Sequence, residues 1–281
     1  MSASPTAFTM PAAARVGRIA LRVGSIDRLL AFYRDVVGLD VTVDGDEAVL
    51  SAAGEPLVVL HEDPDAPARP DDAAGLFHLA VRVPSRAALG DALARVEASE
   101  VSLTGASDHL VSEALYLRDP EGNGVEIYSD RPREAWPTTD DGVEMDTLRL
   151  DLDDVAAAAT GADALPAGTD LGHVHLEVTA LDRARSFYVD GLGLNVRTEA
   201  YQGALFVAAG DYHHHVGLNT WNHRRAASGQ HRGIEWFEFR LPDRATLDDL
   251  REHLAVRGID RSPGGGVVDP DGICVRFAVD S

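Results

Sequence analysis

The stretch that decides the fold is "SIDRLLAFYRDVVGLDV", residues 25–41, because "ALDRARSFYVDGLGLNV" at residues 180–196 repeats it. When residues 17–41 are aligned with residues 172–196, 11 of the 25 positions are identical. Both copies begin with alternating apolar residues, typical of a strand, and continue with apolar residues at helical spacing. Self-similarity of this length indicates a duplication and predicts two copies of one structural unit.

A weaker similarity divides each copy again. "HLAVRV" (78–83) aligns with "RIALRV" (18–23), and "GIEWFEFRLP" (233–242) aligns with "GLFHLAVRVP" (75–84). A segment with helical spacing follows each of these strands. We therefore predict an α+β fold of four modules, each with a strand, a helix and then several strands in the order βαβββ. The modules start near residues 15, 75, 171 and 233.

The repeat also predicts how the chain is divided. The segment between the second and third modules is acidic and alanine-rich and contains several Pro and Gly residues, which is typical of a linker, here with one short helix. The predicted parts are a flexible N-terminal arm (1–14), a first two-module domain (15–132), an acidic linker (133–169) and a second two-module domain (170–281).

The composition excludes several classes of function. The chain has 281 residues and a formal net charge of -21, and all of its basic residues are arginine. This charge repels phosphate backbones and anionic membranes, so we expect neither nucleic acid nor a membrane as a partner. With one cysteine, Cys274, no internal disulfide can form. No long apolar run or signal peptide is evident, so we expect a cytoplasmic protein, and the acidity suggests adaptation to salt.

Strand periodicity places several polar residues on one face. Residues two apart on a strand face the same side. In "GHVHLEV" (172–178), His173, His175 and Glu177 therefore share a face opposite the apolar residues, and His78 takes the same side of its own strand. In "GVEIYS" (124–129), Glu126 faces away from its apolar neighbours. We expect these polar faces to line the hollow of a curved sheet.

Two longer motifs resemble a known family. "DHLVSEALYLRDPEGNGVEIYSDRPREAW" (108–136) and "YHHHVGLNTW" (212–221) are similar to the catechol 2,3-dioxygenase branch of the vicinal oxygen chelate superfamily, which includes glyoxalases and extradiol dioxygenases. The four βαβββ modules resemble the same superfamily over almost the whole chain. The resemblance implies two tandem domains with curved mixed sheets.

The resemblance also implies a metal site, because metal ligands in this superfamily come from the first and last strands of a module. The first-strand position holds Arg18, His78, His173 and Trp236 in modules one to four, and the last-strand position holds Glu126 in module two and Arg276 in module four. What remains is His78, His173 and Glu126. Two histidines and one carboxylate form a triad that binds Fe(II), with Mn(II) as the alternative, and leaves positions open for substrate and dioxygen.

Further residues match the dioxygenase motif one by one. His109 in "DHLVS" would be the histidine that hydrogen-bonds the bound substrate or oxygen, and Tyr116 would lie against a catechol oxygen. His215 in "YHHHVGLN" would be the acid–base histidine, which suits proton transfer near neutral pH. The residues expected to bind substrate are His175, Asn219 and Trp221.

The resemblance thus implies an enzyme of aromatic hydrocarbon catabolism that takes a small aromatic diol and dioxygen and opens the ring beside the diol. A homo-oligomer is expected for this fold. In the family, the two modules of the C-terminal half supply all the ligands, whereas here modules two and three share them. The two modules must therefore meet within one chain or across a subunit contact.

Two other functions remain open. A glyoxalase-type isomerase or transferase would keep the fold and the metal, but such sites usually use two histidines and two carboxylates, and no clear second carboxylate is found here. A non-catalytic protein that binds aromatic ligands is the third hypothesis, since Arg18, Trp236 and Arg276 occupy half of the ligand positions.

Overall fold

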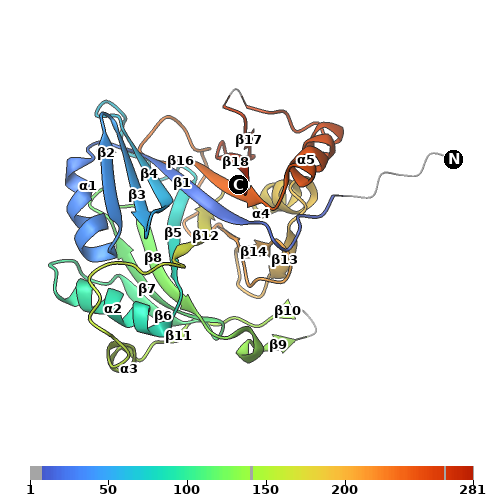
Figure 1. Cartoon of the computed structure of the whole chain (residues 1–281). Coiled ribbons are helices and arrows are strands. Elements are labelled where there is room, and N and C mark those ends of the chain that lie inside the picture. The colour runs from blue at the N-terminus through green and yellow to red at the C-terminus, as the bar shows by residue number, and fades with distance from the viewer. Residues whose placement is uncertain (1–7, 140–141, 263, 281) are drawn as a thin grey trace.

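The computed structural model describes residues 8–139, 142–262 and 264–280, and its strands form two large mixed sheets (Figure 1). The first sheet combines modules one and four. In spatial order its strands are β17 (Val267–Val268), β18 (Cys274–Val279), β16 (Gly233–Leu241), β1 (Arg15–Val23), β4 (Glu55–Glu62), β3 (Glu47–Ala52) and β2 (Asp40–Asp44).

The second sheet combines modules two and three. In spatial order its strands are β11 (Leu148–Arg149), β6 (Gly105–Asp108), β7 (Ser112–Arg118), β8 (Gly124–Asp130), β5 (Gly75–Val83), β12 (Asp170–Glu177), β15 (Val216–Asn219), β14 (Ala204–Ala208) and β13 (Asn195–Thr198). A separate pair of short strands, β9 (Thr138–Thr139) and β10 (Gly142–Val143), belongs to neither sheet. The predicted α+β class with curved mixed sheets is confirmed.

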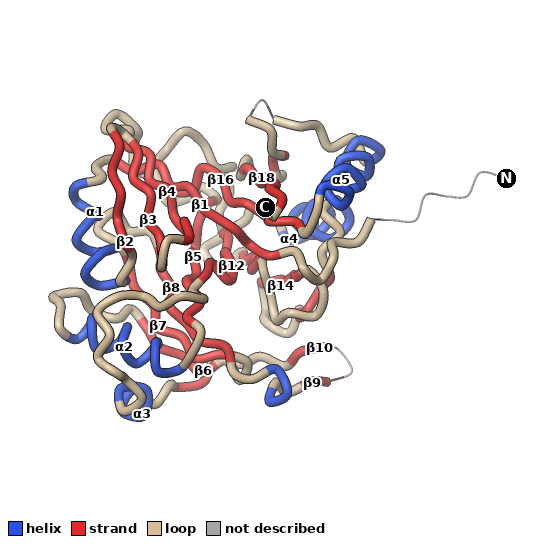
Figure 2. The backbone as a smooth tube through the Cα atoms, viewed as in Figure 1, coloured by secondary structure: helices blue, strands red, loops and turns tan. Residues whose placement is uncertain are grey.

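The helices lie around the outside of the strands (Figure 2). The repeated segment forms a short α-helix that continues directly as a π-helix in both copies, and in the first copy it ends at Gly38, whose φ of 94° is the left-handed conformation that glycine adopts most easily. The helical elements are α1 (Asp27–Ala31), η1 (Phe32–Val37), α2 (Arg86–Glu97), η2 (Arg133–Ala135), α3 (Leu152–Ala156), α4 (Leu181–Arg185), η3 (Ser186–Gly191) and α5 (Arg244–Val256).

Strand alternation separates the core from the polar hollow. On β5, Leu79, Val81 and Val83 are buried in the main hydrophobic cluster. On β12, Val174 and Leu176 belong to the same cluster. The opposite face of these strands is left to the polar residues, as the periodicity predicts. The two sheets meet at their centres, where β1 contacts β12 and β16 contacts β5.

The order of the modules in space differs from their order in the sequence. Antiparallel pairing of β1 with β16 joins modules one and four, and antiparallel pairing of β5 with β12 joins modules two and three. Modules two and three therefore meet within one chain. The division into domains at 15–132 and 170–281 follows the sequence repeat and remains a prediction. In the structure, each large sheet takes strands from both ranges.

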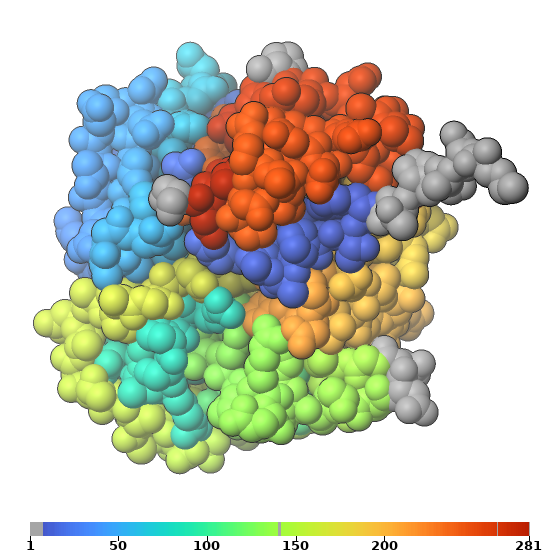
Figure 3. All heavy atoms as spheres, turned by 45° about the vertical axis from the view of Figure 1, so that its right-hand side comes forward, coloured from blue at the N-terminus to red at the C-terminus, as the bar shows by residue number. Residues whose placement is uncertain are grey.

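The segments outside the modules pack against them. Within the predicted arm, residues 1–7 lie outside the described part, whereas Met10 is buried and its N–H donates to the carbonyl of Gly193. Figure 3 shows this dark blue segment against orange residues of module three. In the predicted linker, β11 pairs with β6 and α3 packs on α2. None of the described helices is both long and apolar enough to cross a membrane.

Candidate metal centre

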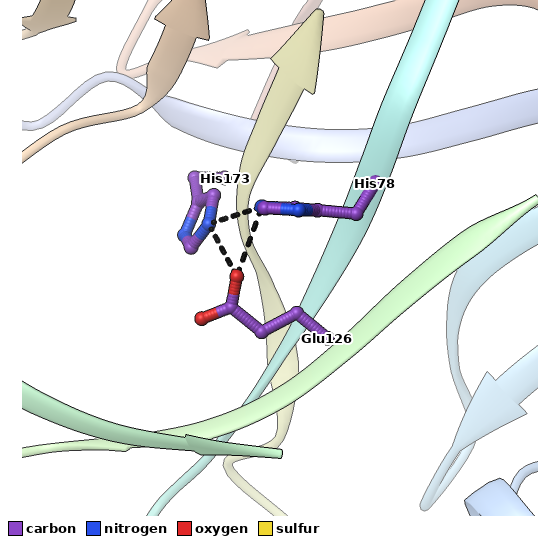
Figure 4. A group of neighbouring side chains, drawn as sticks. All are labelled: His78, Glu126 and His173. Carbon is purple, nitrogen blue, oxygen red and sulfur yellow. Dashed lines mark hydrogen bonds and ion pairs between the residues drawn. The ribbon is translucent and has the colours of Figure 1, made fainter. Parts of the chain in front are cut away.

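Strand register brings three side chains to one point above Ala80. Glu126 is the neighbour of Ala80 on the parallel strand β8, and His173 is its neighbour on the antiparallel strand β12. His78 lies two residues before Ala80 and so projects from the same face of β5. Because Ala80 is buried and ends at Cβ, it leaves room for the three larger side chains above it. Figure 4 shows His78, Glu126 and His173 pointing toward one another.

The three side chains are spaced like ligands of a single ion. His78 Nε2 lies 2.9 Å and His173 Nε2 3.2 Å from Glu126 Oε2, and the two Nε2 atoms are 3.3 Å apart. Two ligand atoms at right angles about an ion, each about 2.1 Å from it, lie about 3.0 Å apart. The observed spacings match that value on all three sides. Among the described residues, this is the one group of three His, Cys, Asp or Glu side chains close enough to share an ion.

The site favours the protonation states that bind metals. Burial lowers the pKa of His173 to about 4, so its imidazole is neutral at pH 7. Burial alone would raise the pKa of Glu126, but the facing imidazoles of His173 and His78 hold it well below its ordinary value. A neutral imidazole and an ionised carboxylate are the forms that ligate a metal. The donor types and their charge states therefore fit a divalent transition metal.

The corresponding place in the other sheet has no ligand set. Ala20 takes the role of Ala80, and its neighbours are Val59 on β4 and Trp236 on β16. The guanidinium groups of Arg18 and Arg276 lie 5.8 and 4.2 Å from the ring centroid of Trp236. The two guanidinium groups and the indole ring thus occupy the place in the first sheet that corresponds to the His78, Glu126 and His173 cluster in the second sheet.

The fourth possible ligand position in the second sheet is the last-strand position of module three, which corresponds to Glu126 of module two. It is occupied by a glycine, which has no side chain. Gly217 on β15 is paired with His175, as Arg276 is paired with Glu238 in the other sheet. A Cβ atom at Gly217 would lie 2.9 Å from two ring carbons of His175, closer than real contacts allow. The site therefore offers three candidate ligands and leaves one side open.

The open side faces a cavity of about 260 Å³. His78, Glu126 and His173 lie in its wall, together with His109, Tyr116 and residues of aromatic or apolar type. Phe77, Phe206 and Trp221 form much of the apolar wall, and no described lining residue is a lysine or arginine. Trp221 is 40% exposed, and its Nε1–H donates to the carbonyl of Gln202. The cavity suits one small, mostly apolar ligand.

His109 and Tyr116, two of the expected catalytic residues, lie together in this wall. His109 Nε2 is 2.6 Å from the hydroxyl of Tyr116, and His109 Nδ1 is 2.7 Å from the carbonyl oxygen of Asp146. A carbonyl only accepts, so Nδ1 carries the hydrogen and Nε2 accepts from the tyrosine. Burial and the charge of Glu126 raise the pKa of Tyr116 well above its ordinary value, which keeps the phenol protonated.

The orientation of the three consecutive histidines, residues 213–215, differs from the expectation. His214, and not His215, lines the cavity, and its ring centroid is 4.1 Å from that of His173. His215 lies outside the lining, and its Nδ1 accepts from the N–H of Ala209. Strand alternation predicts His213 and His215 on one face with Asn219, but β15 begins only at Val216. In the bend before that strand the period of two does not apply.

Of the three predicted substrate-binding residues, two line the cavity and one does not. His175 and Trp221 line the cavity. Asn219 is fully buried outside the lining, where its Oδ1 accepts from the N–H of Trp221, so it supports the wall from behind. His175 is buried against the rings of Phe77 and Trp221, with centroids 5.1 and 5.3 Å away.

Sequence reasoning missed several residues of the wall. His214 could have been found only by recognising that its neighbours precede the strand. Phe77, Tyr201 and Phe206 carry no motif, and Met145 and Thr147 lie in the segment that the sequence marks as a linker. That segment contributes to the cavity because β11 holds it at the edge of the second sheet.

Burial of His215 predicts that the metal-free protein loses stability in acid. Burial lowers the pKa of His215 to about 3, so below its ordinary pKa the unfolded chain binds a proton that the folded chain does not. This loss of folding free energy is absent above about pH 6.5, the ordinary pKa of histidine, and grows as the pH falls toward 3. It should cost about 2 kcal/mol between pH 7 and pH 5. Urea unfolding of wild type and His215→Asn, which retains an acceptor, should show a smaller loss in the variant, and equal losses would contradict the prediction.

Both the sequence and the fold of the chain are similar to those of known proteins. The profile of the Glyoxalase/Bleomycin resistance protein/Dioxygenase superfamily matches residues 15–127 and 170–277. The chain is 40% identical over 242 residues to "Catechol-2,3-dioxygenase" of Bacillus subtilis (strain 168), covering 83% of this chain and 85% of that protein.

Solved structures support the fold. A crystal structure of a protein from Bacillus subtilis subsp. subtilis strain 168 superposes with a TM-score of 0.63 at 17% identity, covering 97% of this chain and 86% of the other. The crystal structure of glyoxalase I from Zea mays gives a TM-score of 0.58 at 16% identity, with coverages of 94% and 92%. At these identities the likeness concerns the fold alone.

Proposed function

The chain belongs to the Glyoxalase/Bleomycin resistance protein/Dioxygenase superfamily, and from this premise we propose that it is an extradiol ring-cleaving dioxygenase acting on catechol or a substituted catechol. The observation that carries the proposal is the convergence of His78, Glu126 and His173 on a cavity whose wall also holds non-ligand histidines. The relative named for this activity is similar over most of its length.

The metal ligands in this proposal are His78 Nε2, His173 Nε2 and one oxygen of Glu126. We propose Fe(II) as the metal, with Mn(II) as the alternative, because both accept two imidazoles and a carboxylate. When bound, such an ion supplies a common template for the two catechol oxygens and dioxygen, together with the electron transfer between them.

The other residues bind the substrate and control its protons. His214 lies in the cavity wall, and its Nε2 would accept the proton of a catechol hydroxyl, which is the role that the sequence motif suggested for His215. The hydroxyl oxygen of Tyr116, whose hydrogen goes to His109 Nε2, would accept a further hydrogen bond from the substrate. Phe77, Phe206 and Trp221 would hold the aromatic ring and exclude water from the reacting atoms.

The glyoxalase-type alternative is less well supported. It would require a second carboxylate ligand, and the fourth position is occupied by Gly217 with no room for a side chain beside His175. Within the part of the chain that is described, no further acidic residue joins the group of three. The non-catalytic alternative leaves unexplained why three buried ligands remain in place in one sheet while the equivalent positions of the other sheet are filled.

The decisive assay is ring cleavage under controlled oxygen. Protein reconstituted anaerobically with Fe(II) should consume one dioxygen per catechol when air is admitted and release a yellow ring-opened semialdehyde. The same protein without oxygen should give no product. A protein that binds iron but cleaves no simple catechol would contradict the proposal, and metal-dependent conversion of a glutathione hemithioacetal without oxygen would favour the glyoxalase-type reading.

Four further proposals depend on properties of the whole protein. A homo-oligomer and a role in aromatic hydrocarbon catabolism remain expectations from the resemblance, and a cytoplasmic location remains an expectation from the sequence pattern. Adaptation to salt remains an expectation from the net charge of -21. For the last of these, the free energy of unfolding should rise between low and high salt, because salt screens the mutual repulsion of the acidic groups.

A further inference from the structure

A row of hydrogen bonds leads from Asp130, the last residue of β8, to the wall of the cavity. Asp130 Oδ1 lies 2.9 Å from His213 Nε2, and His213 Nδ1 lies 2.7 Å from His214 Nδ1. His214 completes the row in the cavity wall, where its ring contacts those of His173 and Phe206 at centroid distances of 4.1 and 4.9 Å.

The row begins at a group that can only accept. Asp130 is held ionised, since the guanidinium of Arg82 donates to it at 3.1 Å and the hydroxyl of Tyr212 at 3.0 Å. An ionised carboxylate has no hydrogen to give, so His213 must carry its hydrogen on Nε2. In a neutral imidazole the other nitrogen is then an acceptor. His213 Nδ1 therefore accepts, and His214 Nδ1 carries the hydrogen between them.

The same rule applied once more leaves Nε2 of His214 without a hydrogen. This nitrogen makes no hydrogen bond to any residue that the structure describes. We propose that Asp130 and His213 are positioning residues that fix the tautomer of His214, so that its Nε2 lone pair faces the cavity and accepts a hydrogen bond from a substrate hydroxyl. The catalytic consequence rests on the proposed function, but the tautomer does not.

The other non-ligand histidines of the cavity lack this combination. His109 has its tautomer fixed by the carbonyl of Asp146, but its Nε2 is already occupied by the hydroxyl of Tyr116. His175 Nε2 is buried without a hydrogen-bond partner among the described residues, so no bond at this nitrogen fixes the tautomer. Among these three, His214 is the one that combines a fixed tautomer with a free lone pair.

The tautomer can be read directly in the metal-free protein. Long-range proton–nitrogen correlation spectra of protein labelled with ¹⁵N-histidine distinguish protonated from unprotonated ring nitrogens, and His214→Gln assigns the signals. At pH 7 we expect His214 with a protonated Nδ1 and an unprotonated Nε2, and His213 with a protonated Nε2. A protonated Nε2 on His214 would overturn the proposal. The signals of His61, which lies in the other sheet, should not change in His214→Gln and provide the internal control for the assignment.

Substitutions then test the consequence for turnover. His213→Phe preserves an aromatic ring but removes the acceptor for His214 Nδ1, and it should mix the His214 tautomers and lower kcat about 10- to 100-fold, with KM for catechol changed less than about 2-fold. Metal content should be unchanged. Asp130→Asn keeps an acceptor oxygen for His213 and should retain more turnover than His213→Phe.

The outcomes separate this proposal from the proposed function. If His213→Phe keeps both the His214 tautomer and kcat, the positioning role is wrong. If the substituted proteins do not fold, the spectrum of the wild-type protein still decides the tautomer. If the wild-type protein cleaves no catechol, the dioxygenase proposal fails, whereas the spectrum continues to test the row from Asp130 to His214.

Discussion

Replacing His173 with alanine is expected to lower the affinity of the protein for Fe(II) or Mn(II) by at least about 100-fold, and ring cleavage should be lost with the metal. His173 supplies one of the three atoms that lie 2.9 to 3.3 Å apart, and alanine leaves only His78 and Glu126. His78→Ala and Glu126→Gln should have effects of the same order. Metal content after dialysis, together with titration calorimetry of the metal-free proteins, measures the change.

The control for these substitutions comes from the other sheet. His61 lies on β4 and pairs with Glu235 and Glu47, away from the cavity. His61→Ala removes an imidazole of the same kind and should leave metal content unchanged. Circular dichroism of each variant separates lost ligation from lost folding. Full metal retention by all three ligand variants would refute the site.

The second large effect is expected at His214. His214→Gln should lower kcat for ring cleavage about 10²- to 10⁴-fold, the usual contribution of a positioned acid–base group, while the metal content stays at the wild-type level. The reason is that His214 lies in the cavity wall beside His173 and that its Nε2 makes no hydrogen bond to a described residue. Steady-state oxygen uptake with catechol gives kcat and KM separately.

Two further variants make this test specific. His223→Asn changes an exposed histidine outside the cavity lining, at a φ of 52° that asparagine tolerates, and should leave kcat unchanged. His215→Asn tests the role that the sequence motif assigned to its neighbour. If His215→Asn abolishes turnover while His214→Gln leaves it within about 2-fold of wild type, the assignment to His215 is restored.

The repeat was sufficient to predict the fold class and the strands that carry the triad. Residues 17–41 and 172–196 share both the alternation of a strand and the spacing of a helix, so local pattern and duplication agree. The shared face of the proposed ligands follows from strand parity, which is a local property, because His78, Glu126 and His173 all lie inside regular strands. Their role as ligands is what the family resemblance implies.

The partner of each module could not be predicted in the same way. Pairing of β5 with β12 depends on which apolar faces meet across the molecule, and residues 83 and 170 are separated by a long intervening segment. Adjacent elements in a sequence usually lie next to each other, so a pairing of module one with module four is not the default expectation. The complementary loss of ligands indicated only that modules two and three share a site.

The prediction of which histidine in the run faces the cavity was wrong for a local reason. His213, His214 and His215 precede β15, so which ring faces the cavity is set by the bend after β14 and by the hydrogen bond from His213 to Asp130. No pattern in the sequence encodes that bend. The contribution of Met145 and Thr147 to the cavity wall was hidden for the same reason, since it depends on pairing between β11 and β6.

The most direct test of the central claim is anomalous scattering from crystals of the protein loaded anaerobically with Fe(II). The proposed site predicts one strong iron peak per chain, about 2.1 Å from His78 Nε2, His173 Nε2 and an oxygen of Glu126, with its open side toward the cavity lined by His214. The peak should disappear in His173→Ala. An iron peak on other residues, or none at full iron loading, would contradict it.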